Sequence, residues 1–186
     1  MSGESGERSE PWPRGCVQVY TGDGKGKTTA AFGMALRAAG RGMRVWIGQL
    51  MKGFPYGELA GAGMLGGLLT VEQHGSPECI PWREEPRAED VERARKGLDA
   101  CKRALSSGNY RIVVLDEACV ALGFALIEER DLLELIDLRP PEVELVLTGR
   151  GAPRAVIERA DLVTEMRELK HPYATQGLEA RDGIER

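Results

Sequence analysis

A glycine-rich loop between an apolar run and a helical pattern is the feature that most constrains the fold. The apolar run at residues 16–21 (CVQVYT) predicts a buried strand, and an alanine-rich helical pattern follows at residues 27–39. The loop between them, GDGKGKTT at residues 22–29, supplies glycines that let backbone N–H groups converge on phosphate oxygens. The N-terminus of the next helix adds partial positive charge. This order of elements is the context expected of a phosphate-binding loop.

The spacing of the loop differs from the usual pattern by one residue. The standard motif is a glycine, four residues, and then Gly-Lys-Ser/Thr. Counting back from Gly26 places the first glycine at Thr21, and the nearest glycine is Gly22. Lys27 still supplies a cation and Thr28 a hydroxyl for Mg²⁺. The sequence therefore predicts a phosphate cradle of different dimensions.

Two further polar motifs follow predicted buried strands. Asp116 and Glu117 end the apolar run VVLDEA, where a Walker B acid holds Mg²⁺ or its water in P-loop proteins. Arg150 lies in LTGRGAP, directly after the apolar run at residues 143–148. Ligands of open α/β sheets lie beyond the carboxyl ends of the strands. We therefore expect the loop and these two motifs to form one nucleotide site.

Alternation of apolar runs with helical patterns predicts an α/β fold with a mostly parallel central sheet and helices on both faces. The expected strands are residues 16–21, 44–51, 68–73, 111–115, 143–148 and 162–166. The expected helices are residues 27–39, 90–105, 118–125, 131–138 and 153–160. The glycine-rich segment 53–67 and the tail from residue 171 are expected to be irregular. Residues 1–14 are expected to form a flexible arm, and residues 15–186 a single domain.

Composition limits the kinds of partner. A net charge of −4 argues against general nucleic-acid binding, which requires a basic face. No stretch approaches the ~20 apolar residues of a membrane span, and the polar N-terminus lacks the apolar region of a signal peptide. The four cysteines, without metal-site spacing, predict reduced, packed thiols in a cytoplasmic protein; they are Cys16, Cys79, Cys101 and Cys119.

One tryptophan and two histidines could have either a ligand-binding or a purely structural role. Trp82 lies in the proline-rich loop SPECIPWREEP, where it either offers a stacking surface for a flat ligand or packs the loop down. His74 and His171 have no carboxylate or cysteine partner at useful spacing. We interpret both histidines as local packing or hydrogen-bonding residues.

The combined motifs resemble one family. The runs QVYTGDGKGKTTAAFG, LDE, VLTGRGAP, ADLVTEMRELKHP and GLEARDGIE closely resemble the P-loop ATP:corrinoid adenosyltransferases, from about Gly15 to Glu185. The resemblance implies a RecA-like P-loop fold. It also implies transfer of the 5′-deoxyadenosyl group of ATP to the cobalt of a reduced corrinoid, either cob(I)alamin or cob(I)yrinic acid a,c-diamide, with release of triphosphate. Because the reduced corrinoid is itself a strong nucleophile, no protein nucleophile is expected.

The resemblance also implies roles for residues, with ATP lying reversed so that the loop holds its terminal phosphates. Lys27 and Thr28 stabilise the leaving triphosphate, and Thr28 and Glu117 match the positions that hold Mg²⁺ or Mn²⁺, beside the strand-end acid Asp116 as a further metal candidate. The corrinoid contacts Ile80 and Trp82, where Ile80 replaces a family aromatic. The implied ATP-binding residues are Gly22, Asp23, Gly24, Lys25, Gly26, Lys27, Thr28, Thr29, Arg37 and Arg150.

The same resemblance implies a homodimer and an electron-donor protein such as a flavodoxin. Two other functions share the loop and the strand-end acid. A RecA-like ATPase or kinase cuts a terminal phosphoanhydride and yields ADP or orthophosphate, whereas adenosyl transfer leaves triphosphate intact. A non-catalytic module binds corrinoid and ATP without turnover.

Overall fold

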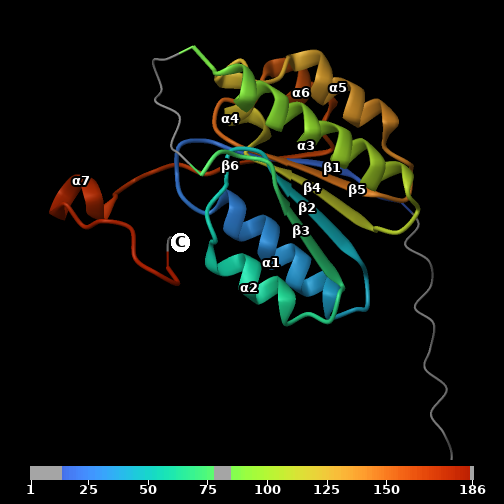
Figure 1. The fold of residues 1–186 in the computed structure, drawn as a ribbon, viewed down its shortest axis with the longest axis horizontal. Helices are drawn as coiled ribbons and strands as arrows, with labels where there is room; N and C mark the ends of the chain where they lie inside the picture. The colour runs from blue at the N-terminus through green and yellow to red at the C-terminus, as the bar shows by residue number, and fades with distance from the viewer. Residues whose placement is uncertain (1–13, 78–84, 185–186) are drawn as a thin grey trace, which may run out of the picture.

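The computed structural model describes residues 14–77 and 85–184 (Figure 1). The predicted N-terminal arm, apart from Arg14, lies outside these residues, as do Cys79, Ile80 and Trp82. The predictions made for those side chains therefore stay predictions.

The strands of the described chain form one parallel sheet, in the order β3-β2-β4-β5-β1-β6 (Figure 1). They are β1 (Val17–Thr21), β2 (Val45–Gln49), β3 (Leu69–Gln73), β4 (Ile112–Asp116), β5 (Glu144–Thr148) and β6 (Leu162–Glu165). In the register Gln49 is the partner of Asp116, and Tyr20 of Thr148. The carboxyl ends of β1, β2, β4 and β5 therefore lie next to one another, at the same end of the sheet. The predicted parallel sheet is confirmed.

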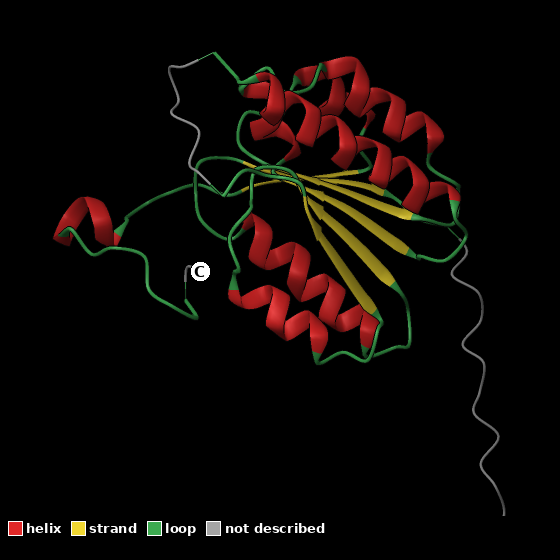
Figure 2. Cartoon of the chain, viewed as in Figure 1, coloured by secondary structure: helices red, strands yellow, loops and turns green. Residues whose placement is uncertain are grey.

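Helices cover both faces of the sheet, as predicted (Figures 1 and 2). One face carries α1 (Lys27–Ala39) and α2 (Gly57–Gly63), and the other carries α3 (Ala88–Ser106), α4 (Ala118–Gly123), α5 (Glu129–Leu138) and α6 (Arg154–Arg159). In β4, Val113 and Leu115 pack on the α3 side while Val114 packs on the α1 side. Parallel strands covered on both sides are apolar throughout for this reason.

Two short helices were not expected. The segment at residues 53–67 contains α2, although three of the seven residues in this helix are glycines, each costing about 1 kcal/mol relative to alanine. Packing of Ala62 into the apolar cluster around α1 stabilises α2 in spite of that composition. The tail contains α7 (Pro172–Gln176), which starts with proline at its first turn. His171 caps this helix because its Nδ1 accepts from the Tyr173 N–H at 3.2 Å, so the hydrogen-bonding prediction for His171 is confirmed.

The last strand differs from the others. All four residues of β6 are exposed, and the strand lies at the edge of the sheet beside β1. Beyond it the chain leaves the sheet and carries α7 away from the main body (Figure 1).

The described cysteines are free thiols. Cys101 and Cys119 are buried and Cys16 is partly exposed. Burial, with a smaller contribution from Glu117, raises the pKa of Cys119 to about 12. These two buried thiols are packed, as predicted, and their raised pKa values keep them protonated near neutral pH. Within residues 14–77 and 85–184, none of the helices is both long and apolar enough to span a bilayer.

Candidate nucleotide-binding site

The glycines of the loop are required by the fold itself. Gly22 and Gly26 have φ of 92° and 116°, in the region that favours glycine. A Cβ on Gly22 would lie 2.4 Å from the carbonyl oxygen of Met166, just beyond β6. The N–H of Gly24 donates to that same oxygen at 2.7 Å, and a Cβ on Gly24 would lie 2.7 Å from the carbonyl carbon of Arg167. The loop is thus packed against the chain that follows β6, which the sequence alone did not indicate.

The Lys27 ammonium is held inside the loop. Its Nζ donates to the carbonyl oxygens of Gly22 and Gly24, at 2.7 Å each. Burial lowers the pKa of Lys27, and the charge of Arg150 lowers it further, against the opposing effect of Glu117. The loop therefore holds this cation through two of its own carbonyl oxygens.

Asp116 is the centre of a buried hydrogen-bond network. Its carboxylate is fully buried and forms an ion pair with Lys52, whose Nζ lies 3.1 Å from Oδ2. The Thr28 hydroxyl donates to Oδ1 at 3.0 Å, and the Thr148 hydroxyl donates to the same oxygen at 2.7 Å. Gln49 Nε2 donates to Oδ2 at 3.2 Å. The ends of three neighbouring strands and the loop therefore converge on one carboxylate.

Glu117 faces the cavity from a strained backbone position. Its φ of 61° lies in the left-handed region, which is uncommon for a residue other than glycine and is concentrated at functional sites. The backbone N–H of Glu117 donates to the Thr148 hydroxyl at 2.9 Å, which holds this turn in place. Burial and then the neighbouring Asp116 raise the pKa of Glu117, while Lys52 and Lys27 oppose them. Glu117 thus lines the cavity, whereas Asp116 is buried beneath it.

Lys52 is the main residue that the sequence reasoning missed. Its side chain is 15% exposed, and its ammonium lies 3.3 Å from Thr28 Oγ1 and 3.5 Å from Glu58 Oε1. Burial lowers the pKa of Lys52, but Asp116 and Glu58 outweigh it, so the net shift is upward. The signal was present, because Lys52 comes soon after the end of β2. The strand-end rule that selected Asp116 applies equally to Lys52.

Two predicted arginines are placed differently. Arg150 lines the cavity, at the turn after β5 where Gly149 has a φ of 133°. Arg37 lies in the last turn of α1 and is absent from the cavity lining, although its neighbour Leu36 is part of that lining. Adjacent helix residues project in different directions, so the two side chains lie on different faces of α1. The structure therefore brings Arg150 to the site but not Arg37.

One large cavity connects these groups. Its volume is about 1490 Å³, above the ~1,000 Å³ upper range of ordinary small-molecule sites. Its polar end is formed by residues 23–29, Lys52, Glu117 and Arg150. Its apolar end is formed by α1 and α2, and the tail adds a wall that includes His171 and Ile184. The cavity therefore joins the charged groups of the loop to an apolar wall.

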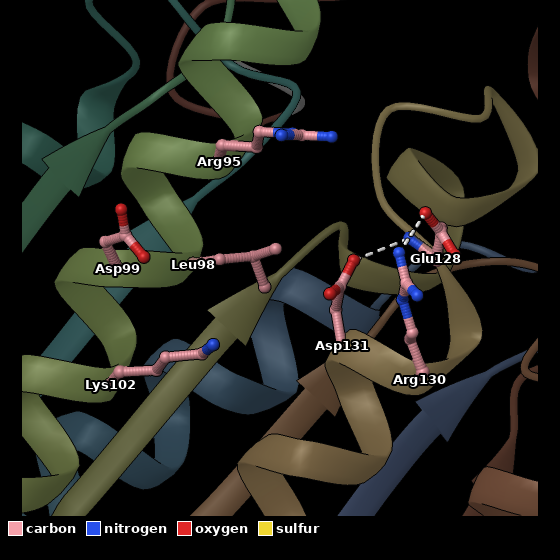
Figure 3. A pocket seen from close by; sticks show the side chains of 7 residues that line it. All are labelled: Arg95, Leu98, Asp99, Lys102, Glu128, Arg130 and Asp131. Atoms are coloured by element: carbon pink, nitrogen blue, oxygen red, sulfur yellow. Dashed lines mark hydrogen bonds and ion pairs between the residues drawn. The ribbon is translucent and has the colours of Figure 1, made fainter.

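A smaller hollow lies on the other face of the sheet, between α3 and the start of α5 (Figure 3). Its volume is about 290 Å³. Arg130 pairs with Glu128 at 2.7 Å, and the Glu128 N–H donates to Asp131 at 2.7 Å in the cap of α5. These polar groups satisfy one another and serve the helix start, so the glycine loop and its partners remain the candidate site.

The fold and the loop together define a P-loop nucleotide-binding protein of RecA-like architecture. The crystal structure of the RadB recombinase superposes with a TM-score of 0.53 at 15% sequence identity, over 86% of this chain and 77% of that one. At that identity the similarity concerns the fold alone.

Residues 13–186 match the family described as ATP:corrinoid adenosyltransferase BtuR/CobO/CobP. The chain belongs to this family, which confirms the resemblance found in the motifs. The corrinoid adenosyltransferase of Escherichia coli K12 is 35% identical over 178 residues, covering 92% of this chain and 86% of the relative. The corrinoid adenosyltransferase of Pseudomonas aeruginosa is 37% identical over 173 residues, covering 92% and 84%.

Proposed function

We propose that this chain transfers the 5′-deoxyadenosyl group of ATP to the cobalt of a reduced corrinoid and releases triphosphate. The observation that carries the proposal is the family match over residues 13–186 in a chain whose glycine loop opens into one large cavity. Family membership makes the chain an enzyme of the corrinoid adenosyltransferase class.

The residues around the loop suit the electrostatics of this reaction. The cobalt–carbon bond forms with an electron pair from cobalt, and the C5′–O bond breaks with its electrons leaving on triphosphate. The leaving group carries several negative charges, and we assign their stabilisation to Lys27, which the loop carbonyls hold, and to the loop N–H groups. Since the nucleophile belongs to the corrinoid, the protein contributes orientation and charge stabilisation.

The oxygen groups beside the loop fit a magnesium ion. The Thr28 hydroxyl lies 3.0 Å from the buried Asp116 carboxylate, and Glu117 faces the same cavity. Hard oxygen donors of this kind suit Mg²⁺, which binds proteins through one or two carboxylates together with phosphates. We assign Thr28, Asp116 and Glu117 to hold it directly or through water. The ion supplies positive charge to the phosphate chain.

Product analysis tests the proposal. The protein is incubated with MgATP and cob(I)alamin under strong reduction, and the light-sensitive spectrum of the cobalt–carbon product is followed. We expect an adenosylated corrinoid and intact triphosphate in equal amounts. ADP or orthophosphate in their place would make the chain an ATPase or kinase, and corrinoid binding without transfer would make it a binding module.

The finer predictions rest on the resemblance and on the sequence. They comprise the choice between cobalamin and an a,c-diamide precursor, a homodimer, a flavodoxin-type electron donor and a cytoplasmic location. Parallel assays with the two corrinoids test the first, and sedimentation equilibrium tests the second.

A further inference from the structure

The Lys52 ammonium lies between the groups to which we assign the metal ion. Its Nζ is 3.1 Å from Asp116 Oδ2 and 3.3 Å from Thr28 Oγ1. These are hydrogen-bonding distances for an ammonium, and they engage the same oxygens that a magnesium ion needs. Lys52 and the metal therefore compete for one set of ligands.

The fold gives a reason for a cation at this place. Asp116 is fully buried, and a buried carboxylate without a counter-charge is costly. Because Gln49 and Asp116 are register partners, the chain that leaves β2 passes directly beside the end of β4. Lys52 lies on that segment and neutralises Asp116 from within the chain.

We propose that Lys52 is an internal counter-ion of the metal site, which neutralises Asp116 in the nucleotide-free protein and is displaced when Mg²⁺ enters with ATP. The inference rests on the proposed magnesium site. It adds a positioning residue, which acts through Asp116 and makes metal binding depend on the nucleotide. The phosphate charges then offset the free energy lost when Lys52 leaves Asp116, and a free metal ion without nucleotide has no such compensation.

A second resting place for the ammonium lies within reach. Glu58 Oε1 is 3.5 Å from the Lys52 Nζ, and the Tyr56 ring centroid is 5.2 Å from it. Tyr56 and Glu58 belong to the start of α2 and line the same cavity. Carboxylates and aromatic faces both stabilise an ammonium, so a small rotation of the side chain transfers the charge from Asp116 to α2. Metal binding is thereby coupled to the helix that forms the apolar end of the cavity.

Titration of Mn²⁺ by electron paramagnetic resonance, without nucleotide, tests the displacement. We expect Lys52→Gln to bind Mn²⁺ about tenfold tighter than the wild type, a typical size for coupling between two binding events. Mg²⁺ should also raise the melting temperature of Lys52→Gln more than that of the wild type. Lys96→Gln, which removes an exposed lysine paired with Glu92 on α3, is the matched control and should behave as the wild type. Equal or weaker Mn²⁺ binding by Lys52→Gln would overturn the proposal.

A second variant keeps the test decisive if Lys52→Gln folds poorly. Glu58→Gln removes a carboxylate whose side chain is 22% exposed, and we expect it to weaken Mn²⁺ binding several-fold in the presence of ATP, since the displaced ammonium loses its resting place. Unchanged Mn²⁺ binding by this single variant would overturn the displacement path. Where Lys52→Gln folds, the same change in that background should have no effect. Equal weakening in both backgrounds would place Glu58 on the metal and overturn the displacement path.

The outcomes separate this inference from the proposed function. The Mn²⁺ titration uses no corrinoid and no adenosyl transfer. Tighter binding by Lys52→Gln with no adenosylation would remove the proposed reaction and leave the counter-ion role. Adenosylation by the wild type, together with identical Mn²⁺ affinities of the wild type and Lys52→Gln, would support the proposed reaction and overturn the counter-ion role.

Discussion

The two ends of the large cavity are organised by different forces. At the loop end the cations and carboxylates are paired: Lys27 with loop carbonyls, and Lys52 with Asp116 and Glu58. At the α1–α2 end the lining includes the apolar side chains of Phe32 and Leu36 from α1 and Ala62 from α2. Changes at the paired end disturb buried charges, which is expensive, whereas changes at the apolar end alter only surface shape and hydrophobicity. Substitutions at the paired end should therefore reduce stability or activity more than substitutions at the apolar end.

Asp116→Ala should have the largest effect, on stability. It removes the nearer and fully buried of the two carboxylates that pair with the Lys52 ammonium and leaves only Glu58 at 3.5 Å, and breaking a buried ion pair costs about 3–5 kcal/mol. Urea unfolding measures the loss. Asp116→Asn keeps hydrogen-bonding atoms and should lose less. If both variants unfold like the wild type, the paired end is not organised by this carboxylate.

Lys27→Ala should abolish most of the activity. Removing one group that stabilises developing charge typically lowers kcat about 10²–10³-fold. The initial rate of cobalt–carbon bond formation is the measurement, with Lys96→Ala as a control for loss of one exposed lysine. Turnover near the wild-type level would contradict the assignment of the loop to the leaving group.

Leu36→Asp tests the apolar end. Leu36 is 58% exposed and lines the cavity, so a charge there should spare folding. We propose that the corrinoid lies against this apolar end. The KM for the corrinoid should therefore rise about tenfold, a usual size for altering an apolar contact, while the affinity for MgATP stays constant. Leu138→Asp is the matched control, because Leu138 is 46% exposed and lies at the end of α5, on the other face of the sheet. A change in MgATP affinity alone would show that the two ends are not separate.

His74 lies outside the lining of the cavity, so the pH dependence that it gives to stability serves as a control for both ends of the cavity. Burial lowers the pKa of His74, and Glu72, 3.4 Å away, opposes that effect only in part. Below the unfolded-state pKa of about 6.5, the unfolded chain takes up a proton that the folded chain does not, so stability falls as pH falls. His74→Gln should flatten this slope between pH 5 and 7 in urea unfolding, with or without ATP. An unchanged slope would assign the acid sensitivity elsewhere.

Gly61→Ala should have the smallest effect, with the opposite sign. A Cβ at Gly61 meets nothing within 4 Å, and the residue lies inside α2. The substitution should stabilise the protein by about 0.4–1 kcal/mol, because alanine loses less conformational freedom on folding. Thermal unfolding measures it, and a destabilised variant would show that α2 needs glycine for its backbone.

The part of the site that the sequence predicted is the part carried by local patterns. The strand, loop and helix around Lys27 and the strand-end acids were evident because each motif is contiguous in the chain. Gln49 and Lys52 were missed although they lie at or soon after the end of β2, because their contact with Asp116 depends on the register between β2 and β4. Glu58 was missed because its helix is rich in glycine and is stabilised by packing of Ala62. Arg37 was assigned by motif resemblance, but it is absent from the cavity lining, which its neighbour Leu36 on α1 joins.

The contact between the loop and Met166 affects how mutational scans of this protein are interpreted. A scan that replaces Gly22 or Gly24 reports on a collision with the backbone at residues 166 and 167 as well as on phosphate binding. Loss of function at either glycine is therefore ambiguous until folding is measured alongside it. The same contact limits how far the chain can be shortened. A truncated chain whose last residue precedes Met166 lacks the carbonyl that accepts from the Gly24 N–H. The carboxyl-terminal segment is thus part of the loop's scaffold, and shortened variants are best designed to end beyond it.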